Sequence, residues 1–177
     1  REQHKHTKIG TTCRGIGPAY EDKVSRRNLR LGDFLTDSYE SKLQSLVEYH
    51  NFLLTEYYKV DAVNYEQLKI SLIHLIEKIL PLLVDTYTYV NRFKVKNKSI
   101  LLEGAQGALL DIDQGTYPCV TSSNTAIGGA CSGSGVGALS IDYVLGIAKA
   151  YTTRVGEGPF PTELMDADSE HLSTIGH

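Results

Sequence analysis

Apolar residues recur at three- and four-residue steps through the middle of the chain, and this spacing predicts two long helices. The first is expected from about Tyr39 to Tyr58. The second is expected from about Tyr65, kinked or broken near Pro81 and resuming to about Phe93, because proline removes a helix hydrogen bond. We interpret both as packing and connecting elements, whose tyrosines serve interior surfaces rather than a binding box.

A further helix is predicted at residues 19–34, before the central pair. The dipeptide Gly17-Pro18 offers a helix start, because proline is tolerated in the first turn. Glu21 and Asp22 would lie in that first turn, and Gly32-Asp33 would end the helix.

The last third of the chain has a different pattern. The short apolar run Ser99–Leu102 is typical of a buried strand, and the alternating residues 144–156 read as another, with a short strand at Cys119–Val120. The predicted fold class is therefore α/β: part of a mostly parallel central sheet with flanking helices, incomplete at both ends.

The connections between these predicted strands are rich in Gly, Ser and Thr. Residues 117–137 are otherwise read as loop, residues 139–143 as a helical turn, and residues 165–177 as polar turns. Loops that follow strands in α/β folds are common ligand sites.

Charge is unevenly distributed along the 177 residues, whose formal net charge is -3. Residues 1–30 carry eight Lys or Arg against three acidic residues. The negative total argues against a general nucleic-acid binder, whereas the local positive field fits a small anionic ligand.

Cysteine usage, histidine spacing and hydropathy bear on the cellular compartment, on metal binding and on membrane insertion. Cys13, Cys119 and Cys131 form no C-x-x-C pair, so neither a disulfide framework nor a zinc site is indicated, and reduced thiols in the cytoplasm are expected. His4 and His6 lack the Cys or acidic neighbours that would complete a metal site, so no metal ligands are assigned. No apolar run has the length of a membrane span and no signal peptide is visible, while both ends look cut from a longer protein.

The stretch GTTCRGIGP combines glycines, threonines and a helix start, which together suit a bound phosphate. The alternative is a glycine-rich turn with threonine as a cap. It is not a P-loop, since G-x-x-x-x-G-K-S/T is absent.

Arg26 lies eight residues beyond Pro18, on the order of 12 Å along a helix axis. A phosphate at the start of its own helix is therefore an awkward target. Arg26 would either pair with Asp22 on the solvated face or reach a phosphate held by another subunit.

Two later stretches also carry candidate chemistry. Gln106 in EGAQG offers a donor and an acceptor that could read a base edge or stabilise oxygen charge. Residues 121–124 form a hydroxyl and amide cluster, beginning at Thr121, that suits phosphate or sugar. Tight turns and a serine-rich loop are the alternatives.

Taken together, these motifs resemble the adenylosuccinate synthetase family. GIGPAYEDKVSR fits the signature G-I-G/R-P-x-Y-x-x-K-x-x-R at each fixed position, and LLEGAQGALLDIDQGTYPCVTSSNT and KAYTTRVGEGPFPTEL match two further characteristic stretches in family order. The resemblance covers essentially all 177 residues, although the helices between Tyr39 and Asn97 carry little of it.

The resemblance implies GTP-dependent joining of L-aspartate to IMP, with magnesium, to give adenylosuccinate, GDP and phosphate on the route to AMP. Thr12 and Thr121 would contact the IMP phosphate, and Gln106 would bind the base and stabilise the 6-oxyanion. Arg26 would cross to the IMP of the partner in a homodimer. Lys23, the signature lysine, would be functionally important and is counted with Gln106 as catalytic.

The resemblance also implies missing parts. The GDEGKGK-type loop with the catalytic Asp, the following His, the aspartate-binding loop and the guanine site are not in this sequence. We therefore expect residues 1–177 to be the central part of one domain, with an IMP-phosphate loop and signature helix at 1–30, a helical segment at 31–97 and IMP-binding loops at 98–177.

Magnesium and most of the GTP site would then lie outside the chain, which alone would be inactive. The alternatives are a non-catalytic nucleotide-phosphate module and a dimerisation segment.

Overall fold

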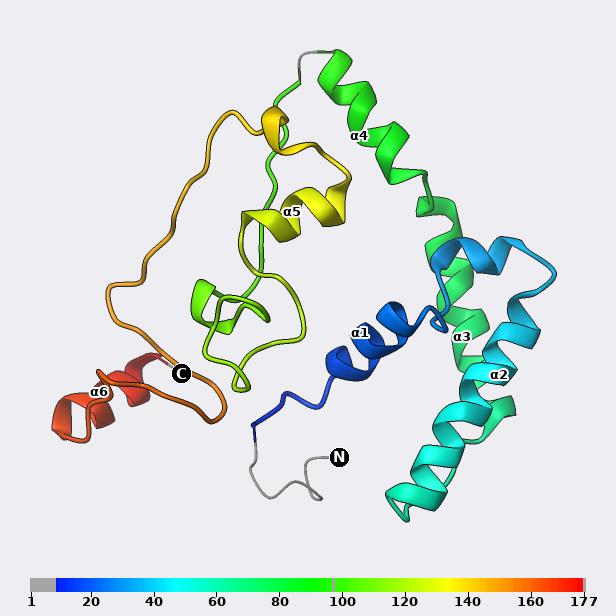
Figure 1. Ribbon diagram of the computed structural model, residues 1–177, viewed down its shortest axis with the longest axis horizontal. Helices are drawn as coiled ribbons and strands as arrows, with labels where there is room; N and C mark the ends of the chain where they lie inside the picture. The colour runs from blue at the N-terminus through cyan, green and yellow to red at the C-terminus, as the bar shows by residue number, and fades with distance from the viewer. Residues whose placement is uncertain (1–8, 97, 177) are drawn as a thin grey trace.

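The computed structural model describes residues 9–96 and 98–176, and these form a chain of helices joined by long irregular segments (Figure 1). The α-helices are α1 (Ile16–Ser25), α2 (Tyr39–Phe52), α3 (Tyr65–Ile79), α4 (Thr86–Val95), α5 (Ile127–Ser134) and α6 (Ala167–Gly176). Shorter helical turns are η2 (Leu31–Leu35), η3 (Leu53–Tyr57), η4 (Leu80–Leu82), η5 (Ala108–Leu110) and η6 (Ala138–Ser140).

The predicted α/β class is wrong for this structure. Residues 9–96 and 98–176 contain no β-strand, and the segments expected to be strands at 99–102, 119–120 and 144–156 are irregular or turn-like. The apolar pattern indicated extended backbone, but a strand also needs a second segment about 4.8 Å away to accept its hydrogen bonds. No described segment fills that place, and Leu101 and Ile147 remain 87% and 89% exposed.

The central helices confirm the sequence prediction. α2 begins at Tyr39 and its last turn widens into the π-helical η3, which ends at Tyr57. α3 begins at Tyr65 because the side chain of Asn64 caps it, accepting a 3.0 Å hydrogen bond from the backbone N–H of Gln67. The helix breaks into η4 around Pro81 and resumes as α4.

The first helix is shorter than the predicted 19–34. α1 begins after Gly15, which has a left-handed backbone, and ends at Arg26, which is also left-handed at φ 64°. The backbone N–H groups of Arg27 and Asn28 turn back to the carbonyl of Asp22, which stops the helix before the separate turn η2.

Two helices lie where loops and turns were predicted. α5 occupies residues read as loop, and α6 occupies the polar residues near the end of the chain. α5 forms despite its glycines because the Asp111 carboxylate accepts hydrogen bonds from the backbone N–H groups of Thr125 and Ala126 just before it. The helical turn expected at 139–143 appears as η6 at Ala138–Ser140.

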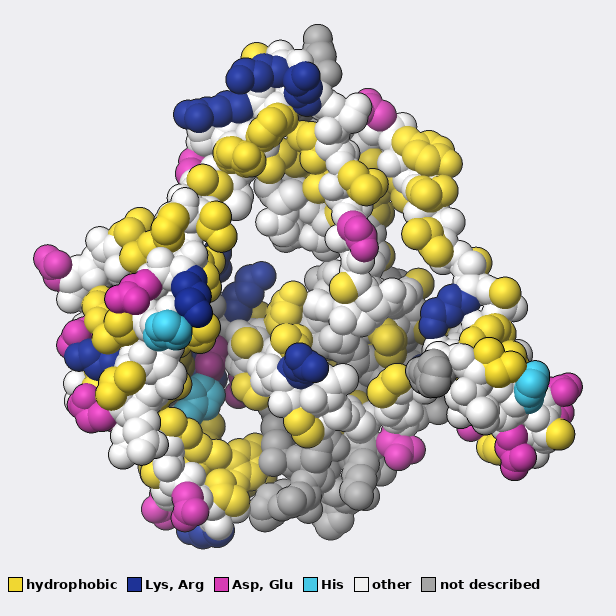
Figure 2. All heavy atoms as spheres, turned by 180° about the vertical axis from the view of Figure 1, so that it is seen from behind, with side chains coloured by type: hydrophobic (Ala, Val, Ile, Leu, Met, Phe, Trp, Pro, Cys, Tyr) yellow, Lys and Arg dark blue, Asp and Glu magenta, His cyan; other side chains and the backbone are white. Residues whose placement is uncertain are grey.

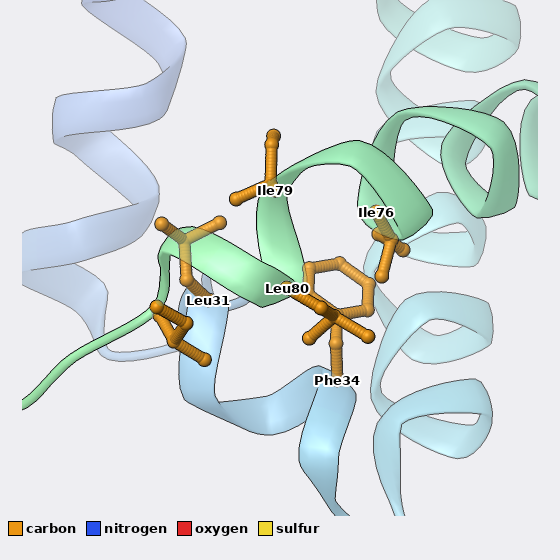
Figure 3. Close-up of a pocket in the computed structure, with 6 residues that line it drawn as sticks. Leu31, Phe34, Ile76, Ile79 and Leu80 are labelled. Atoms are coloured by element: carbon orange, nitrogen blue, oxygen red, sulfur yellow. The ribbon is translucent and has the colours of Figure 1, made fainter.

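The helical group of α2 and α3 holds the apolar packing. Leu43 and Val47 of α2 are the buried hydrophobic residues among those described. Figure 3 shows a second contact, in which η2 meets the end of α3 and η4 through apolar side chains. These are Leu31, Phe34, Ile76, Ile79 and Leu80.

The chain exposes far more surface than a folded monomer of its size. Its accessible surface is 14302 Å², roughly 1.7 times the ~8,500 Å² expected for 19.5 kDa. Figure 2 shows hydrophobic side chains spread across one face of this surface. Little free energy of folding therefore comes from a core within the chain itself.

None of the helices in the described ranges has the length and apolar character that crossing a membrane requires.

Candidate functional site

The loop before α1 leaves donors available for a ligand. Gly15 precedes the helix without a side-chain cap, so the first amides of α1 are not satisfied by a capping side chain. Thr11 Oγ1 accepts a 3.1 Å hydrogen bond from the backbone N–H of Cys13. The Thr12 side chain is exposed and makes no hydrogen bond to the described residues.

The start of α1 lies against the segment that contains Thr121. A Cβ placed on Gly17 would lie 3.4 Å from Ser122 Oγ, which is van der Waals contact. The half-buried Thr121 and Ser122 therefore approach the same helix end that Thr12 precedes. Figure 1 shows α1 between this loop region, below α5, and the helical group of α2 and α3.

The same loop also touches residues near 156. Gly10 and Gly156 both have positive φ, and a Cβ on Gly10 would lie 2.5 Å from Gly156 Cα. The backbone N–H of Glu157 donates a 3.1 Å hydrogen bond to the carbonyl of Ile9. The backbones approach so closely that only glycine fits at position 10.

Arg154 joins the stretch around residue 156 to the turn before Thr121 through hydrogen bonds. Its Nη2 donates to the carbonyl of Cys119 at 2.6 Å and to Thr116 Oγ1 at 3.1 Å. Its Nε donates to the carbonyl of Glu157 at 3.1 Å. The guanidinium thus holds two loops at a fixed separation.

Gln106 lies in an exposed loop with a left-handed backbone, φ 64°. Thr125 Oγ1 donates a 2.8 Å hydrogen bond to the carbonyl of Gly107, the residue after Gln106. Further along, the backbone N–H of Thr121 donates a 2.9 Å hydrogen bond to the carbonyl of Leu110. The loop that presents Gln106 is therefore bonded to the loop that presents Thr121.

Asp111 is the centre of this connection and is 1% exposed. Its Oδ1 accepts from the backbone N–H groups of Asp113 at 2.9 Å and Gln114 at 3.1 Å. Its Oδ2 accepts from Thr125 at 2.6 Å and Ala126 at 3.2 Å. These backbone donors stabilise the ionised form and lower the pKa of Asp111 to about 2, against the cost of burial.

Lys23 and Arg26 lie at the other end of α1. The helix has ten residues and is about 15 Å long, so both are remote from Gly15. Lys23 Nζ lies 5.4 Å from the ring centroid of Tyr20. Asp22 does not pair with Arg26, and the exposed Arg26 guanidinium has no ion-pair or hydrogen-bond partner among the described residues.

The whole chain, residues 1–177, matches the sequence profile of the family described as adenylosuccinate synthetase. The chain belongs to the adenylosuccinate synthetase family.

Curated relatives and a solved structure agree with this assignment. The chain is 58% identical over 170 residues to adenylosuccinate synthetase of Thioalkalivibrio sulfidiphilus, covering 96% of the chain and 40% of the relative. It is 56% identical over 170 residues to that of Colwellia psychrerythraea, covering 96% of the chain and 39% of the relative.

The structure matches that of fully ligated adenylosuccinate synthetase from Plasmodium falciparum at a TM-score of 0.88 and 38% identity. This match covers 97% of the chain and 40% of the solved one. The chain therefore spans about 40% of the length of these synthetases.

The structure brings some of the predicted residues of this synthetase family together and separates others. The loops of Thr12 and Thr121 converge at the start of α1, and the Gln106 loop is bonded to that of Thr121. Lys23 and Arg26 lie at the far end of the helix.

Sequence reasoning did not single out Asp111 or Arg154. The available signal for Asp111 is its position directly after the apolar pair Leu109-Leu110, which favours burial. A buried carboxylate needs hydrogen-bond partners. Nothing in the local pattern distinguished Arg154 from an exposed arginine.

The described residues contain no group of three or more His, Cys, Asp or Glu side chains that could hold a metal ion. The arrangement provides hydrogen-bond donors for an anion, namely the first amides of α1 and the hydroxyls near them.

Proposed function

We propose that this chain forms the IMP-binding part of a complete adenylosuccinate synthetase, which joins L-aspartate to IMP using GTP. The observation that carries the proposal is the meeting of three separate segments at the start of α1. Ser122 lies against Gly17, and Gly156 lies against Gly10. A family assignment over all 177 residues supports it.

The phosphate of IMP would bind where these segments meet. The first amides of α1 point outward from a helix end that favours negative charge. The hydroxyls of Thr12 and Thr121 would donate to the phosphate oxygens. The free Thr12 side chain in the structure supports this role, because no internal bond must be broken first.

Gln106 would act on the base. In the proposed reaction the γ-phosphoryl group of GTP moves to the 6-oxygen of IMP while the N1 proton is removed by a base outside this chain. The amine of aspartate then attacks C6 and displaces phosphate. The amide of Gln106 would donate to the 6-oxygen as negative charge develops on it.

Arg26 would bind the IMP phosphate of a second subunit. The guanidinium is exposed and has no partner among the described residues, and the Arg26 backbone follows a ten-residue helix that is about 15 Å long. An arginine presented across a two-fold interface can make charge-assisted bonds to phosphate. Lys23, exposed on the same helix, would add positive charge.

GTP, magnesium and aspartate would be held mainly outside this chain. Magnesium takes oxygen ligands, and the GDEGKGK-type loop that would supply them by the family resemblance is not in this sequence. When bound, the ion would neutralise charge on the transferred phosphoryl group. No residue of this chain is assigned to it.

The test compares two proteins, the chain of residues 1–177 and the complete synthetase that contains it. Each is assayed for adenylosuccinate with IMP, GTP, magnesium and aspartate. We expect turnover only in the complete protein, because the base, metal and GTP groups lie outside the chain. No turnover by the complete protein would contradict the synthetase function, and comparable turnover by the short chain would contradict its assignment as a part.

A further inference from the structure

A buried carboxylate joins α1 to α2 close to Arg26. Asp22 is 6% exposed and lies in the last half of α1. Its Oδ1 accepts a 2.6 Å bond from Arg27 Nε, and its Oδ2 lies 2.7 Å from Nε2 of His50 on α2. One side chain thus ties the end of α1, and the residue after Arg26, to the neighbouring helix.

The main chain of Asp22 fixes the same region. Its carbonyl accepts from the backbone N–H of Arg26, from that of Arg27 at 3.1 Å and from Ser25 Oγ at 3.0 Å. Asp22 therefore holds the backbone through Arg26 with its carbonyl and the flanking Arg27 with its carboxylate.

Arg26 needs such support. Its φ of 64° and ψ of 25° are left-handed values that a non-glycine residue adopts at a conformational cost. Such conformations persist when the surroundings determine them from several sides. Here the left-handed conformation occurs at the residue that we assign to the IMP phosphate, and not at a glycine.

The anchoring continues on the far side of Arg26. The guanidinium carbon of Arg27 lies 3.9 Å from the ring centroid of Tyr49, which precedes His50 on α2. Arg27 Nη2 also pairs with Glu21 at 3.5 Å. Asp22 and Arg27, on either side of Arg26, therefore both contact α2, while the Arg26 side chain is exposed.

We propose that Asp22 and His50 are positioning residues that aim Arg26 at the IMP phosphate of the partner subunit. The inference rests on the proposed function of Arg26 and adds the device that presents it. His50 acts through Asp22, and Asp22 acts through the left-handed turn at Arg26. Neither residue touches the substrate.

A positioning role differs from a purely structural one in what it changes. Arg26 would bind a phosphate that is distant from the reacting 6-oxygen and does not change in the reaction. Loss of its alignment should raise the KM for IMP and leave kcat nearly unchanged, as expected for uniform binding. A general loss of folding would instead lower the amount of active enzyme for all substrates.

The experiment is a double-mutant cycle in the complete synthetase. The variants are His50→Ala, Arg26→Leu and both together, with KM for IMP, kcat and IMP affinity by calorimetry as readouts. We expect His50→Ala to raise the KM about tenfold, the effect of losing one hydrogen bond to a charged group. In the Arg26→Leu background the same change should have no further effect.

Two variants control for chemistry and position. His50→Gln retains a donor near the place of Nε2 and should restore most of the IMP affinity. His74→Gln makes the same exchange at an exposed histidine of α3 and should leave both constants unchanged. If His50→Ala does not fold, Tyr49→Leu removes the ring beneath Arg27 and should give the same selective rise in KM.

The outcomes separate the two proposals. An unchanged KM for IMP in Arg26→Leu overturns the role of Arg26 and the inference with it. A raised KM in Arg26→Leu with no effect of His50→Ala or Tyr49→Leu overturns the inference alone. Additive effects in the double variant also overturn it, because His50 would then act elsewhere.

Discussion

The backbone N–H of Thr125 donates a 2.6 Å hydrogen bond to Oδ2 of Asp111, fourteen residues earlier in the chain. This bond closes the loop of residues 111–125, which carries Thr121, and the Thr125 hydroxyl joins that loop to the carbonyl of Gly107 beside Gln106. Since Asp111 holds four backbone donors on its two oxygens, the loop around the proposed base and phosphate contacts depends on one carboxylate.

Asp111→Asn should lower both the thermal stability and the activity of the complete enzyme. An amide has one acceptor oxygen, so its NH₂ group would face two of the four backbone donors. We expect the thermal midpoint to fall by several degrees and kcat to fall on the order of tenfold as Gln106 is displaced.

Asp142→Asn provides the matched control, because Asp142 is exposed and has no hydrogen-bond partner among the described residues. Differential scanning fluorimetry and steady-state kinetics measure the two effects. Equal melting temperatures for Asp111→Asn and Asp142→Asn would show that the four donors do not need the carboxylate.

The depressed pKa of Asp111 predicts how this stabilisation depends on pH. A group whose folded pKa is lowered stabilises the folded state above its unfolded pKa, here near 3.8, and loses that contribution as the pH falls towards about 2. The difference in melting temperature between the natural protein and Asp111→Asn should therefore be constant above about pH 5 and shrink below about pH 4.

The difference in melting temperature between the two proteins excludes the pH dependence of stability that they share. Asp33, Glu40 and Asp85 also have pKa values lowered by hydrogen bonds, and they titrate in both proteins alike. A difference that grew on acidification would contradict the assigned pKa direction.

Gln106→Ala should lower kcat by about 10²–10³ and change the KM for IMP less, if the amide acts on charge developing at the 6-oxygen. Gln106→Ala keeps the Cβ that glutamine already carries at φ 64°, so it leaves the backbone strain unchanged. Gln106→Gly removes the amide and relieves that strain, and it should be equally slow. High activity in Gln106→Gly would contradict the role of the amide.

Arg26 should act across the subunit interface. Two variants with weakened IMP binding are mixed at an IMP concentration well below the KM of either one: Arg26→Leu, and Thr12→Ala combined with Thr121→Ala. A mixed dimer then contains one site with intact Thr12 and Thr121 and an intact Arg26 from the other subunit. Adenylosuccinate formation should return to about one half of the natural rate in purified hybrids, because each hybrid has one intact site of two. In a random equal mixture, where about half of the dimers are hybrids, it should return to about one quarter.

The mixing experiment needs proof that hybrids exist. Differently tagged subunits purified through both tags provide it, and each parent mixed with itself gives the background. Hybrid dimers without activity would place Arg26 on the IMP of its own chain.

The sequence predicted the elements whose signals are local. Apolar periodicity located α2 and α3, and Pro81 marked the break before α4. The start of α1 was predicted near Gly17-Pro18 because the sequence signal is local, and the phosphate site before it stays a prediction.

It failed where distant partners decide the outcome. Ser99–Leu102 has a strand pattern but no described segment beside it, so it forms no strand. α5 was missed because its start depends on Asp111, and the length of α1 depends on the turn at Arg26. Arg154 and His50 act through contacts that no local spacing encodes.

The contact of Gly10 with Gly156 has a consequence for the order of events during folding. It joins residues that are far apart in the sequence, and such long loop closures are entropically costly and late. On the ribosome, the segment before α1 would wait for residue 157 to emerge before it could be locked in place. Pulsed hydrogen exchange should then find the amide of Glu157 protected after those within α2, and earlier protection would contradict this order.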